Sequence, residues 1–175
     1  MANFFKKQSK AKEPENVEKA YEYAVFLLSL KLRTIGEVLK KMQGRGYSEK
    51  VIEEVIERLK AQKYLDDQRY AEIYLENLKM YKNFGFYGIK KKFMEKKLPP
   101  NVIERTLTEG LPPEEEEKIA RRFLKKEGFE IKAKLVNEEV QYRTFDEESG
   151  KAKQKTADRL KSRGFRGEVI AKLVF

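Results

Sequence analysis

Apolar residues recur every three or four positions over most of the chain, which places them on one side of an α-helix. Two stretches show this pattern most clearly, at residues 21–28 and 51–59. Thr34 followed by Glu37 is a capping-box pattern at a helix start. Further residues that can cap helices are Ser48, and then Asp66 or Asp67. The pattern therefore predicts an all-α fold.

An internal repeat of helical segments runs through the chain. Residues 40–52 align without a gap on residues 91–103, at an offset of 51, and residues 41–52 of this segment align on residues 159–170 at an offset of 118. In each copy a basic amphipathic helix ends in a turn with Gly or Lys, and a second helix then opens with Val-Ile. Because an apolar helix also precedes each copy, each unit is predicted to hold three helices. The large apolar residues that anchor the three turns are Tyr47, Leu98 and Phe165.

The repeat defines the predicted domain organisation. Residues 1–16 are expected to form a basic, disordered tail, followed by three helical repeats at residues 17–66, 67–111 and 112–175. A unit of about 50 residues buries too little surface to be stable alone. The three repeats are therefore expected to stack into an elongated, curved body.

The third repeat carries an insertion at about residues 128–150. Its two apolar stretches, residues 130–136 and 140–145, can pair as a short hairpin. The acidic end at residues 146–150 instead favours an exposed, mobile connector. We expect the connector, with the hairpin as the alternative.

Composition excludes several kinds of chemistry. The 175 residues include no Cys and no His, which excludes disulfides, thiolate chemistry, Cys/His zinc sites and Ser-His-Asp triads. The glycines lack the spacing of a phosphate-binding loop. Four acids at residues 114–117 follow two prolines at a helix start, where they complement the helix dipole better than they suit a metal site. We expect a protein that is not an enzyme and has no cofactor or metal.

No stretch of the sequence suits a signal peptide or a membrane span. Residues 1–15 lack an apolar core, and the longest apolar stretch is residues 24–28. A helix that crosses a bilayer needs about 20 such residues. We therefore expect a cytoplasmic protein.

Basic residues outnumber acidic residues by 39 to 29, and this formal net charge of +10 favours an anionic partner such as nucleic acid. The net charge is +4 over residues 84–105 and +6 over residues 151–175, against −3 over residues 112–150. The basic residues fall on the second helix of each repeat and the turn after it, so stacked repeats are predicted to form a basic stripe that follows phosphates. The alternative is that each lysine run is the solvated side of an amphipathic helix. The predicted nucleic-acid-binding residues are Lys40, Lys41, Arg45, Lys90, Lys91, Lys92, Lys96, Lys97, Arg159, Lys161, Arg163 and Arg166.

An aromatic turn leads into the lysines of the second repeat. It reads Phe84-Gly85-Phe86-Tyr87-Gly88. Such a turn can dock against a base or a partner protein, or it can pack between helices as residues 34–35 are expected to do in the first repeat. We favour packing.

Two segments resemble the RecX family, bacterial regulators of the RecA recombinase. Residues 64–71, Tyr-Leu-Asp-Asp-Gln-Arg-Tyr-Ala, resemble the signature of the family, and residues 161–170 are similar to its closing motif. The resemblance runs from about residue 17 to the C-terminus, and it departs in the third repeat, where the insertion is longer than usual. It implies a small, mostly monomeric, all-helical protein of tandem three-helix repeats, without cofactor or catalysis.

The resemblance also implies a partner and an activity. It implies a cytoplasmic bacterial protein, in DNA repair, recombination and the SOS response, that binds in the groove of the RecA–single-stranded-DNA filament and restrains ATP hydrolysis, filament growth and strand exchange. Double-stranded DNA is a second possible ligand. We expect Asp66, Asp67 and Arg69 to contact the recombinase while the Lys-rich helices face DNA. The alternative is a general helical-repeat DNA- or RNA-binding protein without a recombinase partner.

Overall fold

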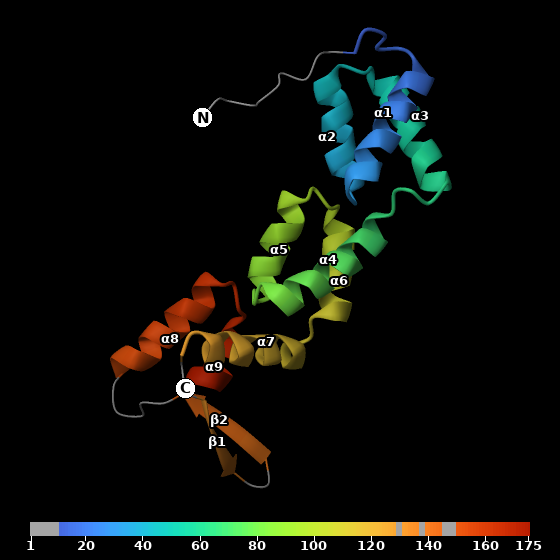
Figure 1. Cartoon of the computed structure of the whole chain (residues 1–175). Coiled ribbons are helices and arrows are strands. Elements are labelled where there is room, and N and C mark those ends of the chain that lie inside the picture. The colour runs from blue at the N-terminus through green and yellow to red at the C-terminus, as the bar shows by residue number, and fades with distance from the viewer. Residues whose placement is uncertain (1–10, 129–130, 137–138, 145–149) are drawn as a thin grey trace. The chain divides into compact units, whose positions relative to one another are not determined.

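The computed structural model of the chain describes residues 11–128, 131–136, 139–144 and 150–175. In this part of the chain, nine helices follow one another, and a two-stranded hairpin lies between the seventh and eighth (Figure 1). The predicted all-α class is confirmed, with the hairpin as an addition. The elements are α1 (Val17–Leu30), α2 (Ile35–Arg45), α3 (Glu49–Ala61), α4 (Asp67–Tyr81), α5 (Phe86–Glu95), α6 (Pro100–Gly110), α7 (Pro113–Lys126), β1 (Ile131–Val136), β2 (Glu139–Thr144), α8 (Gly150–Ser162) and α9 (Gly167–Val174).

The chain divides into two compact units. The first comprises Met1–Tyr70 and Lys96–Pro99, and the second comprises Ala71–Glu95 and Pro100–Phe175. Helices α1, α2 and α3 lie in the first unit, whereas α5 to α9 lie in the second. This division into two units does not test the predicted division into three repeats, which stays a prediction.

The core of the first unit forms where the apolar sides of α1, α2 and α3 meet. Tyr47, the predicted anchor of the turn after α2, packs against this core. The equivalent anchors Leu98 and Phe165 are buried as well. Helical spacing thus predicted the buried side of α3, whereas in the predicted apolar stretch of α1 Val25 and Phe26 are exposed. The fully buried residues of this core are Ala20, Ala24, Val38, Met42, Val55 and Leu59.

The helix starts differ in how they are capped. Thr34 and Glu37 form the predicted capping box at the start of α2. Asp66 caps α4, because its carboxylate accepts the backbone N–H three residues later at 2.9 Å. Ser48 is the N-cap residue of α3, as predicted, but its side chain forms no capping hydrogen bond, and its hydroxyl donates to the Glu15 carboxylate at 2.8 Å.

Part of the predicted tail is folded against the first unit. Residues 1–10 lie outside the described residues. In the described part of the tail, the N–H of Ala11 donates to the carbonyl O of Arg45 at 2.7 Å, and the N–H of Ser48 donates to the carbonyl O of Pro14 at 3.2 Å. The segment just before α1 therefore contacts the turn between α2 and α3.

The turn after the second helix has one backbone conformation in all three repeats. Gly46, Lys97 and Gly164 are equivalent at the offsets of 51 and 118, and their φ angles are 92°, 58° and 78°. A non-glycine residue pays about 1–2 kcal/mol for this left-handed region. Contacts that hold the turn in place are therefore expected at Lys97.

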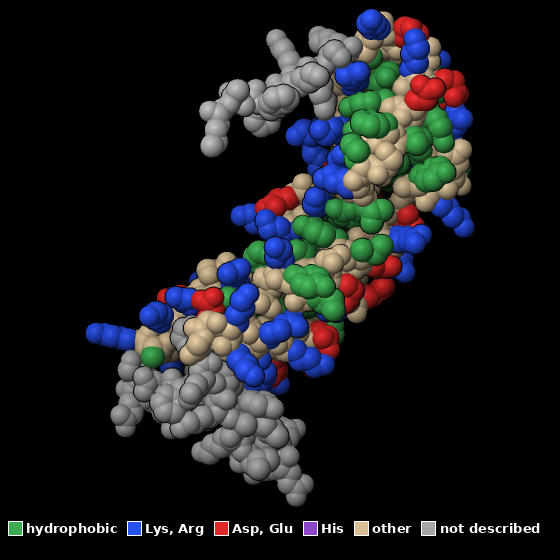
Figure 2. Space-filling model, viewed as in Figure 1, with side chains coloured by type: hydrophobic (Ala, Val, Ile, Leu, Met, Phe, Trp, Pro, Cys, Tyr) green, Lys and Arg blue, Asp and Glu red, His purple; other side chains and the backbone are tan. Residues whose placement is uncertain are grey.

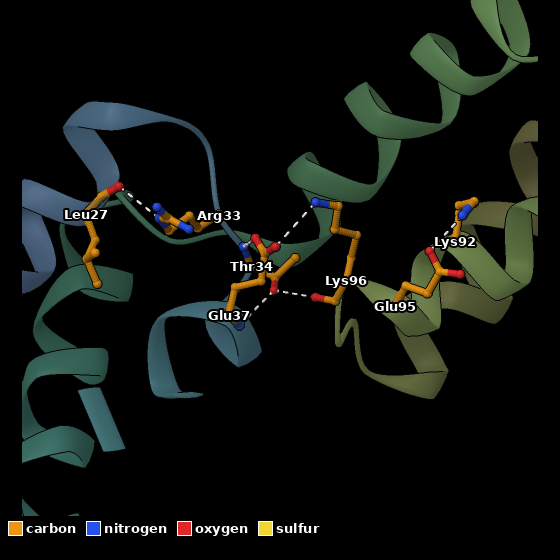
Figure 3. Close-up of polar contacts among 7 residues, drawn as sticks. All are labelled: Leu27, Arg33, Thr34, Glu37, Lys92, Glu95 and Lys96. Atoms are coloured by element: carbon orange, nitrogen blue, oxygen red, sulfur yellow. Dashed lines mark hydrogen bonds and ion pairs between the residues drawn. The ribbon is translucent and has the colours of Figure 1, made fainter. Parts of the chain in front are cut away.

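Such contacts come from the start of α2 in the first unit. The hydroxyl of Thr34 donates to the carbonyl O of Lys96 at 2.6 Å (Figure 3). Gly36 lies so close that a Cβ there would come within 2.6 Å of the Cβ of Lys97. Because this turn packs on α2, residues 96–99 belong to the first unit.

The second unit makes the same contact one repeat further on. The N–H of Gly85 donates to the carbonyl O of Arg163 at 3.1 Å. A Cβ at Gly85 would lie 2.3 Å from the Cα of Phe165, so only glycine allows the two backbones to approach this closely. The start of a second helix thus packs on the turn of the following repeat in both units.

The insertion forms a hairpin where we expected a connector. β1 and β2 pair antiparallel, with Ile131 opposite Thr144 and Val136 opposite Glu139. The expectation of a connector is wrong over residues 131–136 and 139–144. The alternation of apolar and polar residues there is a strand pattern, and the acidic end does not override it. Residues 145–149 of the predicted connector lie outside the described residues.

Candidate nucleic-acid interface

Arg166 lies in a largely buried ion pair, although it is among the residues predicted to bind nucleic acid. Glu116 on α7 has no exposed surface, and its carboxylate pairs with the Arg166 guanidinium. The same guanidinium donates to the carbonyl O of Leu111 at 2.9 Å and lies 4.9 Å from the centre of the Phe86 ring. These contacts hold Arg166 in the fold and leave it little freedom to meet a phosphate.

The Glu116 carboxylate also closes the starts of two helices. One of its oxygens accepts the N–H of Phe86, the first residue of α5, and the N–H of Arg166, just before α9, each at 2.9 Å. The N–H groups at a helix start have no partner within the helix, and a negative charge is favourable there. From the sequence we expected Glu116 to complement the dipole of its own helix. The structure shows that it joins α7 to α5 and α9.

Asp67 has the corresponding position in the first unit. It is 6% exposed, and one carboxylate oxygen accepts the N–H of Ile35, the first residue of α2, at 2.8 Å. Asp67 and Glu116 each lie four residues before a buried alanine. Asp67 is thus turned inward to α2, and the exposed candidates for partner contact at the start of α4 are Asp66 and Arg69.

The position of Asp67 predicts how stability depends on pH. Burial raises the pKa of Asp67 above its ordinary value; the N–H of Ile35 opposes this rise, and the charges of Asp66 and Glu37 add to it. The folded state therefore holds this proton more tightly than the unfolded state, so the stabilising effect of the group is complete below the ordinary pKa and is lost as pH rises through the raised pKa.

The Asp67→Asn variant tests this dependence, because Asn keeps an acceptor for the Ile35 N–H and does not titrate. We expect the unfolding free energy of the wild type minus that of the variant to fall as pH rises across this acid window, and to level off above it. Urea denaturation at a series of pH values measures the difference. A difference that is flat, or that rises with pH, would contradict the assignment.

Several other predicted residues have partners inside the protein. A surface ion pair contributes less than about 1 kcal/mol to stability, so its basic side chain can leave the acid and bind a phosphate instead. Lys96 differs, because its ion pair lies beside the contact of its own backbone with α2 (Figure 3). The ion pairs are Lys92–Glu95 at 2.8 Å, Lys96–Glu37 at 3.3 Å and Arg159–Glu127. The guanidinium–ring contacts are Arg45 with Tyr23 at 5.3 Å, and Arg163 with Phe84 at 5.6 Å and Phe123 at 5.1 Å.

Five predicted residues are exposed and form no ion pair within the part of the chain that the structure describes. Lys40 on α2 and Lys91 on α5 are equivalent in the repeat, and Lys90 precedes Lys91 on the same helix. Figure 2 shows Lys and Arg side chains gathered on the surface over α5. Lys41 is half-buried. The exposed set is Lys40, Lys90, Lys91, Lys97 and Lys161.

Two exposed lysines of α8 are absent from the predicted set. Lys151 and Lys155 line a shallow hollow of about 480 Å³ together with Arg159. The net charge of +6 over residues 151–175 was the signal that could have found them.

The aromatic turn before α5 packs only in part. Phe84 and Phe86 are half-buried, as predicted, but Tyr87 is 59% exposed. The expectation of packing is therefore wrong for Tyr87, because the first turn of α5 directs this one ring to solvent.

Two further features bear on the kind of site. Within the described ranges, no cluster of acidic residues could hold a metal ion. Nor does any helix described there have the length and apolar content to cross a bilayer.

Comparisons with known proteins agree in pointing to one family. A model of the first three-helix domain of RecX matches residues 20–59. The regulatory protein RecX of Geobacillus thermodenitrificans is 32% identical over 157 residues, which is 90% of this chain and 53% of the relative. The chain thus spans about half the length of the curated relatives it matches.

Two solved structures have the same fold. The crystal structure of RecX from Lactobacillus salivarius has a TM-score of 0.70 at 22% identity and covers 89% of this chain and 92% of that chain. A second, titled crystal structure of regulatory protein RecX, has a TM-score of 0.71 at 21% identity and covers 90% of this chain and 72% of that chain.

Fold and surface together define a helical-repeat protein with an exposed lysine at the same position of two repeats. The curated relatives are named regulatory proteins. The chain belongs to the RecX family.

Proposed function

We propose that this protein is a regulator, not an enzyme, that binds a RecA filament on single-stranded DNA and inhibits its ATP hydrolysis, growth and strand exchange. The observation that carries the proposal is the exposure of Lys40, Lys90 and Lys91 without an acidic partner in the described residues. Each unpaired lysine can neutralise a phosphate, and this binding weakens with salt. Membership of a family of regulatory proteins supports a recombinase as the partner.

A protein partner is also supported by exposed apolar side chains. Phe26, Leu30 and Leu32, in and just after α1, are 56%, 61% and 64% exposed. Neighbouring exposed apolar residues mark protein–protein contacts more often than phosphate contacts. In this proposal Asp66 and Arg69 contribute charged contacts to the recombinase.

Titration of this protein into a RecA ATPase assay driven by single-stranded DNA tests the proposal. We expect suppression at less than one molecule per RecA protomer, and excess single-stranded DNA should not relieve it. Suppression that excess DNA abolishes would support the alternative, a general DNA- or RNA-binding protein. No suppression at all would contradict filament regulation.

A further inference from the structure

Tyr87 is an exposed aromatic residue on a fixed support. Its N–H donates to the carbonyl O of Gly164 at 2.8 Å, and a Cβ at the next residue, Gly88, would lie 2.3 Å from the carbonyl O of Arg163. The preceding N–H, of Phe86, is held by the buried Glu116. The backbone that carries Tyr87 is thus fixed on both sides by the turn between α8 and α9 and by α7.

The ring of Tyr87 has an aromatic neighbour and is largely exposed. It meets the Phe86 ring at a centroid distance of 5.4 Å and an interplanar angle of 83°. Phe86 is itself held under the Arg166 guanidinium at 4.9 Å. This T-shaped contact orients the Tyr87 ring, and the 59% exposure of Tyr87 leaves aromatic surface for a ligand.

Cations lie beside this ring on the same side of α5. Lys90 and Lys91 follow Tyr87 by three and four residues, which is the spacing of neighbours on a helix surface. Both are exposed, and neither has an ion pair with a described residue. The acid of this helix, Glu95, pairs with Lys92 instead. Tyr87, Lys90 and Lys91 together form what we call the α5 face.

We propose that the α5 face binds an unpaired nucleotide, with its base stacked on the Tyr87 ring and the adjoining phosphates at Lys90 and Lys91. Exposed aromatics beside cations are the arrangement that binds single strands with little sequence preference. A duplex offers its phosphates but no free base surface, so the α5 face is specific for single-stranded nucleic acid. The inference rests on the proposed function for the lysines, and it adds the role of Tyr87.

The experiment compares an oligo-dT with an abasic oligonucleotide of equal length, because the two share phosphates and differ in bases. We expect Tyr87→Ala to weaken binding to oligo-dT about tenfold and to leave binding to the abasic strand unchanged. Tyr87→Phe should keep the wild-type affinity, because stacking needs only the ring. Tyr81→Ala is the matched control, since Tyr81 is another exposed tyrosine of the second unit.

A spectroscopic readout makes the test independent of affinity. The chain has no Trp, so Tyr87→Trp provides a single tryptophan on the α5 face, whose emission is separated from that of tyrosine by excitation at the red edge of the absorption band. Its emission should be quenched by oligo-dT and not by the abasic strand. Equal quenching by both strands, or equal losses for Tyr87→Ala on both, would overturn the stacking role.

The lysines separate this inference from the proposed function. If Lys90→Gln with Lys91→Gln weakens binding and Tyr87→Ala does not, stacking alone is overturned. If neither change affects binding to oligo-dT, both the stacking role of Tyr87 and the phosphate-binding role of Lys90 and Lys91 are overturned.

Discussion

Replacing Glu116 with Gln is expected to lower the free energy of unfolding by about 3 kcal/mol. The carboxylate is fully buried, accepts the N–H groups of Phe86 and Arg166, and pairs with the Arg166 guanidinium. Gln keeps the shape of the side chain and an acceptor oxygen, but it removes the charge. The guanidinium of Arg166, which is only 20% exposed, then keeps only the exposed Glu168, at 3.6 Å, as an anionic partner. This loss of a charge partner, rather than a cavity, causes the destabilisation.

Glu114→Gln is the matched control, because Glu114 is an exposed acid in the first turn of the same helix. Removing an acid from that position is expected to cost about 0.5 kcal/mol through the helix dipole. Urea unfolding followed by far-UV circular dichroism compares the two variants. Equal unfolding midpoints for Glu116→Gln and the wild type would show that the buried pair does not hold α5, α7 and α9 together.

Replacing Lys90 and Lys91 together with Gln is expected to weaken binding to single-stranded DNA about sixtyfold at ~50 mM salt and about tenfold at ~200 mM. Each lysine that neutralises a phosphate of a single strand contributes about 0.7 to the slope of log affinity against log salt, so two contribute about 1.4. Both side chains are exposed and form no ion pair with described residues, so their loss changes the charge offered to DNA rather than the packing.

The matched control replaces Lys125 and Lys126 with Gln at the end of α7, where both lysines are exposed in the same unit. It changes the net charge by the same amount at another place. Fluorescence anisotropy with a labelled oligo-dT, measured at several salt concentrations, gives affinity and slope together. Equal losses in the two double variants would mean that net charge, and not the α5 face, governs binding. An unchanged slope in the first would rule out phosphate contacts at Lys90 and Lys91.

Much of the helical structure could be predicted from the sequence, because it depends on neighbours a few residues apart. The capping box of Thr34 and Glu37 formed as predicted. The hairpin was visible as an alternation of apolar and polar residues, and we gave the acidic residues after it too much weight. Ser48 is the N-cap of α3 as predicted, but its hydroxyl donates to Glu15, far away along the chain, and accepts no N–H of the helix.

The candidate site was predictable as a set of basic residues and not as a surface. The sequence does not distinguish Lys90 and Lys91 from Arg166, since each follows or precedes a turn in a basic stretch. The structure leaves the two lysines exposed and places Arg166 against Glu116. A basic residue whose partner lies elsewhere in the chain cannot be recognised from its own segment.

The sequence by itself determined the helices, the internal repeat, the excess of positive charge and the family resemblance, because periodicity and composition are properties of short segments. Only the tertiary structure decided which charged residues serve the fold. Arg166 is 50 residues from Glu116, and Asp67 is 32 residues from Ile35, so these contacts exist only once the helices have packed. Packing buries some charged side chains against helix starts. It leaves others exposed to a ligand, together with the ring of Tyr87, because a side chain is covered only where a neighbouring element contacts it.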